Sequence, residues 1–109
     1  MTKGVRTFIA LLAICSCAAV AFADAGKTAI DGKKAFEEHC AACHMDGGNM
    51  VNPAKTLSEK DRLTNGVKSA EDIVARMRNP GPGMTKFDEK TVPDEEARAI
   101  ADYILSTFK

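Results

Sequence analysis

Residues 40–44 read Cys-Ala-Ala-Cys-His, and no other stretch of the 109-residue chain carries as much chemistry. On a helix, side chains three positions apart share one face, so the thiols of Cys40 and Cys43 project in the same direction. The imidazole of His44 directly follows the second thiol. These three side chains can bind one another, a metal ion or a larger group, and the rest of the chain limits the choice.

The first 23 residues predict a secretory signal peptide. Lys3 and Arg6 precede an apolar run, and the small-x-small sequence Ala-Phe-Ala at 21–23 is typical of a cleavage site. The apolar run is too short for a comfortable membrane span. We therefore expect a signal peptide at 1–23, a mature domain at 24–109 and a periplasmic location.

A lipid anchor is the alternative that the same segment leaves open. The small residue Ser16 precedes Cys17, as it does at a lipoprotein processing site. Lipidation at Cys17 would place the protein at the outer membrane, and membrane association is expected in that case only.

The charge balance argues against one class of partner. Lysine and arginine total 15, as do aspartate and glutamate, so removal of Lys3 and Arg6 with the signal peptide leaves a net charge of −2. A nucleic-acid-binding domain of this size is expected to carry a basic face, so we expect no nucleic-acid partner. The chain also has no Trp and one Tyr. So small a domain often depends on a staple, a metal or a cofactor to complete its core.

Turn residues divide the mature chain into helical segments and predict an all-α domain with about four helices. Ser58 and Ser69 are candidate N-caps, each followed three positions later by an aspartate, and Asp31 is a third candidate. Gly32 falls early in the first segment, which indicates either close approach by another helix or fraying of the helix end. The expected helices cover residues 31–43, 59–65, 70–79 and 94–108.

Four interpretations of the Cys-Ala-Ala-Cys-His motif compete. A disulfide between Cys40 and Cys43 would close a very short loop and give His44 no role. A thioredoxin-like redox pair belongs beside strands, and no strand pattern is present. A zinc site using His39 as a fourth ligand would draw all its ligands from one short segment, whereas known sites bring two segments together.

The fourth interpretation is covalent attachment of haem, and it explains all three side chains. Each thiol can reach a different vinyl group of one porphyrin, while His44 turns its ring nitrogen toward the iron. One helical turn then supplies two covalent bonds and one axial ligand. We expect one haem c, attached at Cys40 and Cys43 with His44 as its proximal ligand.

A thioether is the expected ligand on the far side of the iron. Met45 is too close to His44 to cross the porphyrin, and Met50 lies on a poorly braced loop. Met77 falls on the apolar face of a predicted helix and is expected to line the haem pocket. Met84 follows Asn-Pro-Gly-Pro-Gly, a stiff loop whose glycines allow close approach, and it is the predicted distal ligand. His39 is expected to be a surface residue.

These residues together give the chain a resemblance to a known family. The stretches GKKAFEEHCAACHMDGGN, NPAKTL and DYIL resemble the opening helix, the segment after the haem motif and the closing helix of class I c-type cytochromes. Within that family the chain is similar to cytochrome c6 and related small monohaem cytochromes. The resemblance implies a cytochrome c fold around one covalently attached haem.

The resemblance also implies roles for single residues. Gly32 and Phe36 are expected to pack against the closing helix near Tyr103. The carbonyl group of Pro53 is expected to accept a hydrogen bond from His44, and Asn52 is expected near the haem edge.

The axial-ligand loop departs from the common family pattern. The family commonly has Met-Pro-Ala-Phe, and this chain has Met-Thr-Lys-Phe at 84–87. The NPGPGM form resembles c6-like outer-membrane monohaem cytochromes of metal-reducing bacteria, which keeps the lipid anchor at Cys17 as an alternative.

The expected function is transfer of single electrons between periplasmic or membrane-associated redox proteins, by a monomer that docks transiently and catalyses no reaction. Lys55, Lys68 and Lys86 are candidates for a charged docking rim. One alternative is a haem enzyme with a labile sixth ligand, such as a weak peroxidase. Another is a haem-stabilised accessory protein of multihaem electron-transfer complexes.

Mass spectrometry of the protein purified from its native host tests these expectations together. We expect the mass of a chain beginning at Asp24 plus one haem, because the signal peptide is removed and two thioether bonds keep the cofactor attached. A lipidated chain beginning at Cys17 would instead support the anchor. A mass equal to that of the bare polypeptide would contradict the haem interpretation.

Overall fold

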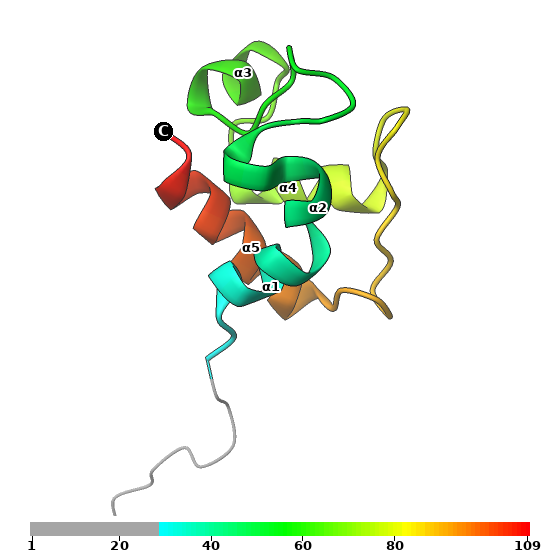
Figure 1. Ribbon diagram of the computed structural model, residues 1–109. Coiled ribbons are helices and arrows are strands. Elements are labelled where there is room, and N and C mark those ends of the chain that lie inside the picture. The colour runs from blue at the N-terminus through cyan, green and yellow to red at the C-terminus, as the bar shows by residue number, and fades with distance from the viewer. Residues whose placement is uncertain (1–28) are drawn as a thin grey trace, which may run out of the picture.

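The computed structural model describes residues 29–109, so the predicted signal peptide and Cys17 lie outside the described residues. Residues 29–109 form helices and connecting segments without any strand, which confirms the all-α prediction (Figure 1). No helix in this part of the chain is both long and apolar enough to cross a bilayer. The elements are α1 (Gly32–His39), α2 (Ala41–His44), the 3₁₀ turn η1 (Met45–Gly47), α3 (Glu59–Thr64), α4 (Ala70–Arg78) and α5 (Asp94–Thr107).

Side-chain caps begin three of these helices at the predicted residues. The carboxylate of Asp31 accepts hydrogen bonds from two backbone N–H groups at the start of α1. The Ser58 hydroxyl accepts from the third residue of α3, and Ser69 and Asp72 cap each other's backbone groups at the start of α4. Each bond satisfies an N–H group that the helix itself leaves without a partner.

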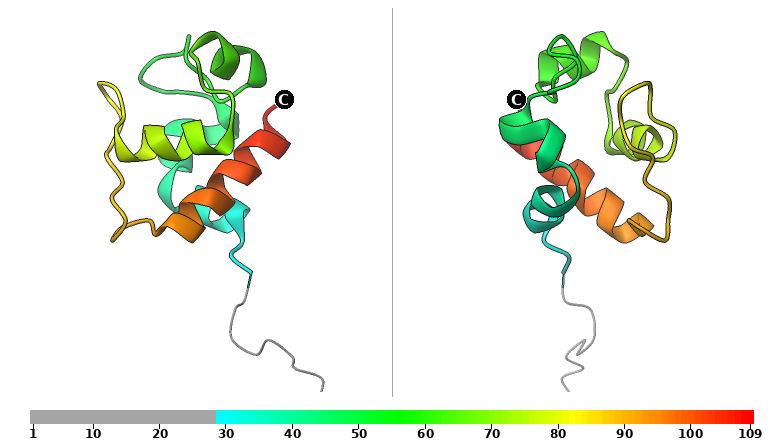
Figure 2. Two further views of the ribbon diagram at one scale, coloured as in Figure 1. Left: turned by 180° about the vertical axis from the view of Figure 1, so that it is seen from behind. Right: turned by 45° about the vertical axis from the view of Figure 1, so that its right-hand side comes forward.

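The core forms where α5 packs against both α1 and α4 (Figures 1 and 2). Ala97, Ile100 and Ala101 of α5 are fully buried between the two neighbours. The ring of Phe36 on α1 lies 5.3 Å from that of Tyr103, centroid to centroid, and 5.6 Å from that of Phe108. Aromatic pairs at these separations contribute beyond the area that they bury.

Gly32 marks the point of closest approach between α1 and α5. A Cβ atom at this position would overlap the backbone carbonyl of Ala99 and lie 3.2 Å from Cβ of Tyr103. The glycine is therefore required by the helix crossing and is not a sign of fraying. The expected packing of Gly32 and Phe36 beside Tyr103 is confirmed.

The first predicted helix is wrong in one respect, because it breaks at Cys40. Cys40 has φ −120° and ψ −33°, outside the helical region. Its N–H group still donates to the carbonyl of Phe36 (2.8 Å), and its own carbonyl accepts from the N–H group of His44 (2.9 Å). The residue thus closes α1 and opens α2 in a new direction. No Gly or Pro marks the break, and the partly buried Cys40 side chain packs against the core.

The substitution Gly32→Ala tests whether the helix crossing governs stability. Alanine favours an isolated helix by about 1 kcal/mol over glycine, but overpacking at the crossing costs about 1–3 kcal/mol. We expect a net loss of stability in chemical denaturation of the haem-loaded protein. Lys34→Ala, exposed on the same helix, should leave the midpoint almost unchanged. A Gly32→Ala variant as stable as the wild type would contradict the close approach.

Candidate functional site

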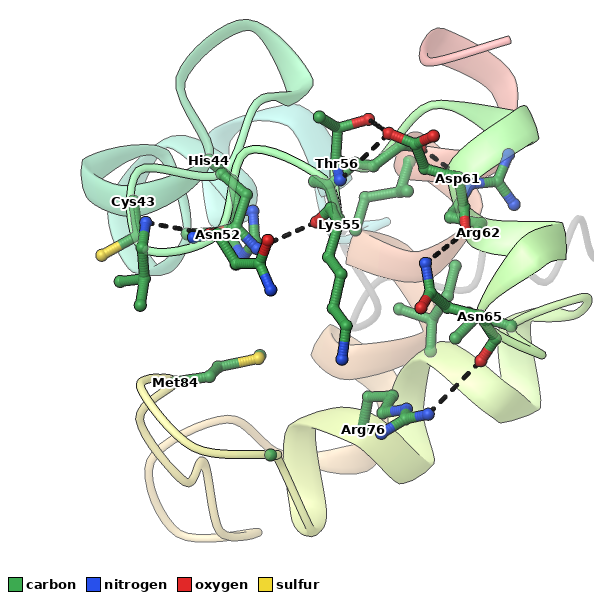
Figure 3. A pocket seen from close by; sticks show the side chains of 18 of the residues that line it. Cys43, His44, Asn52, Lys55, Thr56, Asp61, Arg62, Asn65, Arg76 and Met84 are labelled. Carbon is green, nitrogen blue, oxygen red and sulfur yellow. Dashed lines mark hydrogen bonds between the residues drawn. The ribbon is translucent and has the colours of Figure 1, made fainter.

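A cavity of about 370 Å³ lies between the helix that carries the CxxCH motif and the segment 79–93. This is within the size range of small-molecule and cofactor pockets. Its apolar lining includes Phe36, Ile73 and Ile104 from the core. Figure 3 shows His44 and Met84 on opposite sides of the cavity, with the Met84 sulfur directed into it.

The ring of His44 has a fixed orientation and tautomer. Its Nδ1 atom lies 2.8 Å from the carbonyl oxygen of Gly48. A carbonyl oxygen can only accept, so Nδ1 carries the proton and donates it. The other ring nitrogen, Nε2, keeps its lone pair and can bind a metal ion.

The prediction that the carbonyl of Pro53 accepts a hydrogen bond from His44 is wrong. Gly48 takes that place because the η1 turn reverses the chain directly after His44, with Asp46 at φ 53° and Gly47 at φ 78°. Pro53 is exposed and does not line the cavity, whereas the expected cavity residue Asn52 does. Asn52 also holds its own turn, since its side-chain oxygen accepts from the N–H group of Ala54 at 3.1 Å.

Asn49 organises this loop, a role that we did not predict from the sequence. Its side-chain oxygen accepts from the N–H groups of Val51 (3.0 Å) and Asn52 (2.9 Å). Its amide nitrogen donates to the carbonyl of Lys55 at 2.9 Å. An asparagine that bonds its own backbone two residues on is a recognised turn pattern, so this signal was available in the sequence.

Both thiols of the motif line the cavity and neither forms a disulfide. Cys40 is partly buried, and burial raises the pKa of its thiol to about 11. A thiol with so high a pKa is protonated at neutral pH and is a poor redox nucleophile. Within residues 29–109, no three side chains of His, Cys, Asp or Glu converge into a metal site. The geometry thus favours neither the redox pair nor zinc.

The methionine side chains differ in their exposure and in whether they line the cavity. Met84 and Met77 both line the cavity, and Met77 is also part of the buried core, as expected. Met45 and Met50 are 66% and 72% exposed and do not line it.

His39, expected to be a surface residue, is only partly exposed. Its side chain is 18% exposed and its Nε2 atom lies 3.0 Å from a carboxylate oxygen of Glu96. This contact ties α1 to α5, and the His39 ring packs edge-on against Phe87, with 6.2 Å between centroids. His39 therefore takes part in helix packing and does not line the cavity.

Positive charge exceeds negative charge among the side chains that line the cavity. Lys55, Arg62 and Arg76 contribute to the lining with one carboxylate, Asp61. A hydrogen bond from the Thr56 hydroxyl lowers the pKa of Asp61, which stays ionised at neutral pH. Figure 3 shows the Lys55 side chain extending into the cavity toward Arg76. Of the three lysines expected to form a rim, Lys55 alone lines the cavity.

These features fit haem c, which is an apolar ring that carries two carboxylates. The walls are apolar, the surplus of positive charge can neutralise the carboxylates, and the two thiols lie on the same wall as an imidazole with a free Nε2 atom. A thioether faces them across the cavity (Figure 3). Fold and site together define a small monohaem c-type cytochrome.

Comparisons with known proteins agree with this class. Residues 27–104 match the family described as cytochrome c oxidase, cbb3-type, subunit III. Cytochrome c6 of Rippkaea orientalis is 40% identical over 75 residues, which cover 69% of this chain and 67% of that protein. Cytochrome c6 of Microcystis aeruginosa is 38% identical over 76 residues, covering 70% of this chain and 93% of that protein.

Solved structures show the same likeness. OmcF, outer membrane cytochrome F from Geobacter sulfurreducens, superposes with a TM-score of 0.70 at 44% identity, covering 72% of this chain and 99% of that one. Cytochrome c6 of the diatom Phaeodactylum tricornutum gives a TM-score of 0.63 at 31% identity, covering 70% and 88%. The chain belongs to the class I c-type cytochromes and is a monohaem, cytochrome c6-like electron carrier.

Residues 79–86 carry Met84 and are called the Met84 loop. Two glycines of this loop form a matched pair for mutation. Gly83 has φ 88°, and a Cβ atom there would lie 2.6 Å from Cγ1 of Val51, whereas a Cβ atom on Gly81 would meet nothing within 4 Å. We expect Gly83→Ala to destabilise the haem-loaded protein by about 1–2 kcal/mol, because alanine disfavours the left-handed conformation. Gly81→Ala should cost less, because Gly81 has no left-handed φ and a Cβ atom there meets no protein atom. Chemical denaturation compares the two, and equal midpoints would contradict the close contact of this loop with Val51.

Proposed function

We propose that Cys40 and Cys43 hold one haem by thioether bonds and that His44 and Met84 are the axial ligands of its iron. The bound haem supplies an iron centre that alternates between the ferrous and ferric states. The observation that carries the proposal is the arrangement of His44 and Met84. The Nδ1 proton of His44 is fixed on Gly48, so its Nε2 atom is free to face the thioether across the cavity.

The residues around the iron favour electron transfer over catalysis. A His/Met ligand pair raises the reduction potential relative to other ligand sets and fills the sixth position. Met77, Ile73 and Ile104 give the cavity an apolar lining, which limits the access of water. The chain therefore carries one electron at a time and needs no substrate pocket.

Redox partners are proposed to dock at the side of the cavity formed by the loop after the motif. Val51 lines the cavity and is 59% exposed, and the neighbouring Met50 is 72% exposed. A small apolar patch beside a cation such as Lys55 suits brief contacts with a charged partner. We propose a monomer that docks transiently at this surface.

The location of the protein is proposed from the N-terminal segment. Cleavage after the predicted signal peptide at 1–23 leaves a periplasmic carrier. The likeness to a protein named outer membrane cytochrome F supports the alternative, an outer-membrane lipoprotein anchored at Cys17.

The substitution Met84→Ala tests the axial assignment. We expect loss of the weak long-wavelength absorption band of methionine-ligated ferric haem, a lower reduction potential and new binding of cyanide, because the sixth position opens. Met50→Ala is the matched control and should leave all three unchanged. An unaltered spectrum in Met84→Ala would contradict the assignment, and rapid peroxide turnover by the wild type would favour the enzyme alternative.

A further inference from the structure

The segment 79–93 joins α4 to α5, and its first half, residues 80–86 with Met84, has little structure of its own. Among residues 80–86 themselves, the one hydrogen bond is a long contact of 3.4 Å from the N–H group of Met84 to the carbonyl of Gly81. The pattern Met-Thr-Lys-Phe at 84–87 also places no proline after the methionine. Contacts from outside the loop must therefore hold Met84 against the cavity.

The segment returns to the body of the protein at Phe87. The N–H group of Phe87 donates to the carbonyl of Met77 at 2.9 Å, and its carbonyl accepts from Nη1 of Arg78 at 3.0 Å. Both backbone groups of Phe87 are thus held by the last turn of α4. This anchor lies three residues after Met84.

The same Arg78 side chain reaches the start of α5. Its Nη2 atom donates to a carboxylate oxygen of Asp94 at 2.7 Å, and the Arg78 side chain is 21% exposed. One guanidinium group therefore joins three points: the end of α4, the return of the loop at Phe87 and the first residue of α5. A planar fork can hold two acceptors at once, whereas the ammonium group of lysine lacks this fixed geometry.

We propose that Arg78 is a positioning residue that keeps the Met84 loop closed over the cavity through its bonds to Phe87 and Asp94. The proposal rests on the proposed function, in which Met84 binds the iron. Opening of the loop withdraws Met84, so the Arg78 bonds set how readily another ligand takes its place. Helix-dipole effects favour a cation at the end of α4 and an anion at the start of α5, but a lysine at position 78 would satisfy them equally well.

Arg98 provides a matched control. It also bridges α4 and α5, through a contact of 2.7 Å to the Glu71 carboxylate, and it makes a second contact of 3.3 Å to Asp102 on α5 itself. Its side chain is 54% exposed, and none of its contacts involves the segment 79–93. Loss of Arg98 removes two ionic contacts, compared with one ionic contact and one hydrogen bond to a carbonyl for Arg78, and it does not touch the Met84 loop.

The test measures imidazole binding to the ferric, haem-loaded protein, because imidazole must displace the sixth ligand. We expect Arg78→Gln to bind imidazole about tenfold more tightly than the wild type. A change of this size corresponds to the loss of one charge-assisted hydrogen bond that holds the loop closed. Arg78→Lys should also bind more tightly, since it keeps the charge and loses the fork. Arg98→Gln should stay within about twofold of the wild type, as expected of exposed ion pairs. The long-wavelength band should fade on heating before the helical signal only in the Arg78 variants.

The outcomes separate this proposal from the axial assignment. Suppose that Met84→Ala binds imidazole more tightly than the wild type, but that Arg78→Gln and Arg78→Lys both bind it no more tightly than Arg98→Gln does. This result would overturn the role of Arg78 and leave the axial assignment standing. A wild type that binds imidazole as tightly as Met84→Ala would overturn the axial assignment and this role together. If Arg78→Gln fails to fold with haem, Arg78→Lys decides the question by the same measurement.

Discussion

The close crossing of α1 over α5 is the contact on which the rest of the structure depends. Gly32 lets the two backbones approach, and Phe36 then reaches Tyr103 and Phe108. The His39–Glu96 contact fixes the far end of α1, directly before Cys40. The direction in which α2 leaves α1, and thus the position of the whole motif, follows from a crossing that only glycine permits.

The C-terminal end of α5 extends this effect to the other side of the cavity. The Phe108 ring fills the space over Gly47, where a Cβ atom would lie 2.5 Å from the ring. The Phe108 carbonyl accepts from the buried guanidinium of Arg62, which also donates to the carbonyl of Leu57 at 2.8 Å. A buried cation is tolerated here because it donates to two backbone carbonyls, that of Leu57 before α3 and that of Phe108 at the C-terminal end of α5. The loop that orients His44 and the helix α3 are therefore both tied to α5.

The two walls of the cavity are built in different ways. The His44 wall consists of helix and tight turns, held by backbone hydrogen bonds and by Asn49. The Met84 wall is a proline- and glycine-rich segment whose fixed points lie at its base. With His44 and Met84 as the proposed axial ligands, this asymmetry gives a rigid proximal side and a distal ligand whose retention depends on a few contacts.

The sequence by itself determined those features that depend only on residues close together in the chain. It predicted the all-α class and the caps Asp31, Ser58 and Ser69, because helix caps are local properties. The one-turn spacing of the CxxCH motif is equally local, and the proposed haem attachment rests on it. It also gave two readings of Gly32, between which only the packing of α5 could decide. The family resemblance supplied the pairing of Gly32 and Phe36 with Tyr103.

Only the tertiary structure decided which distant groups meet. The break at Cys40 and the contact of the partly buried His39 with Glu96 have no local signal, because each depends on packing between α1 and α5. Gly48, and not Pro53, is the partner of His44 because the turn at Asp46 and Gly47 brings its carbonyl back to the ring. Arg78 has no local signal either, because at the end of a helix it is an ordinary cation in sequence. Its guanidinium acquires two fixed partners only when the loop at Phe87 and the start of α5 are brought to it by packing.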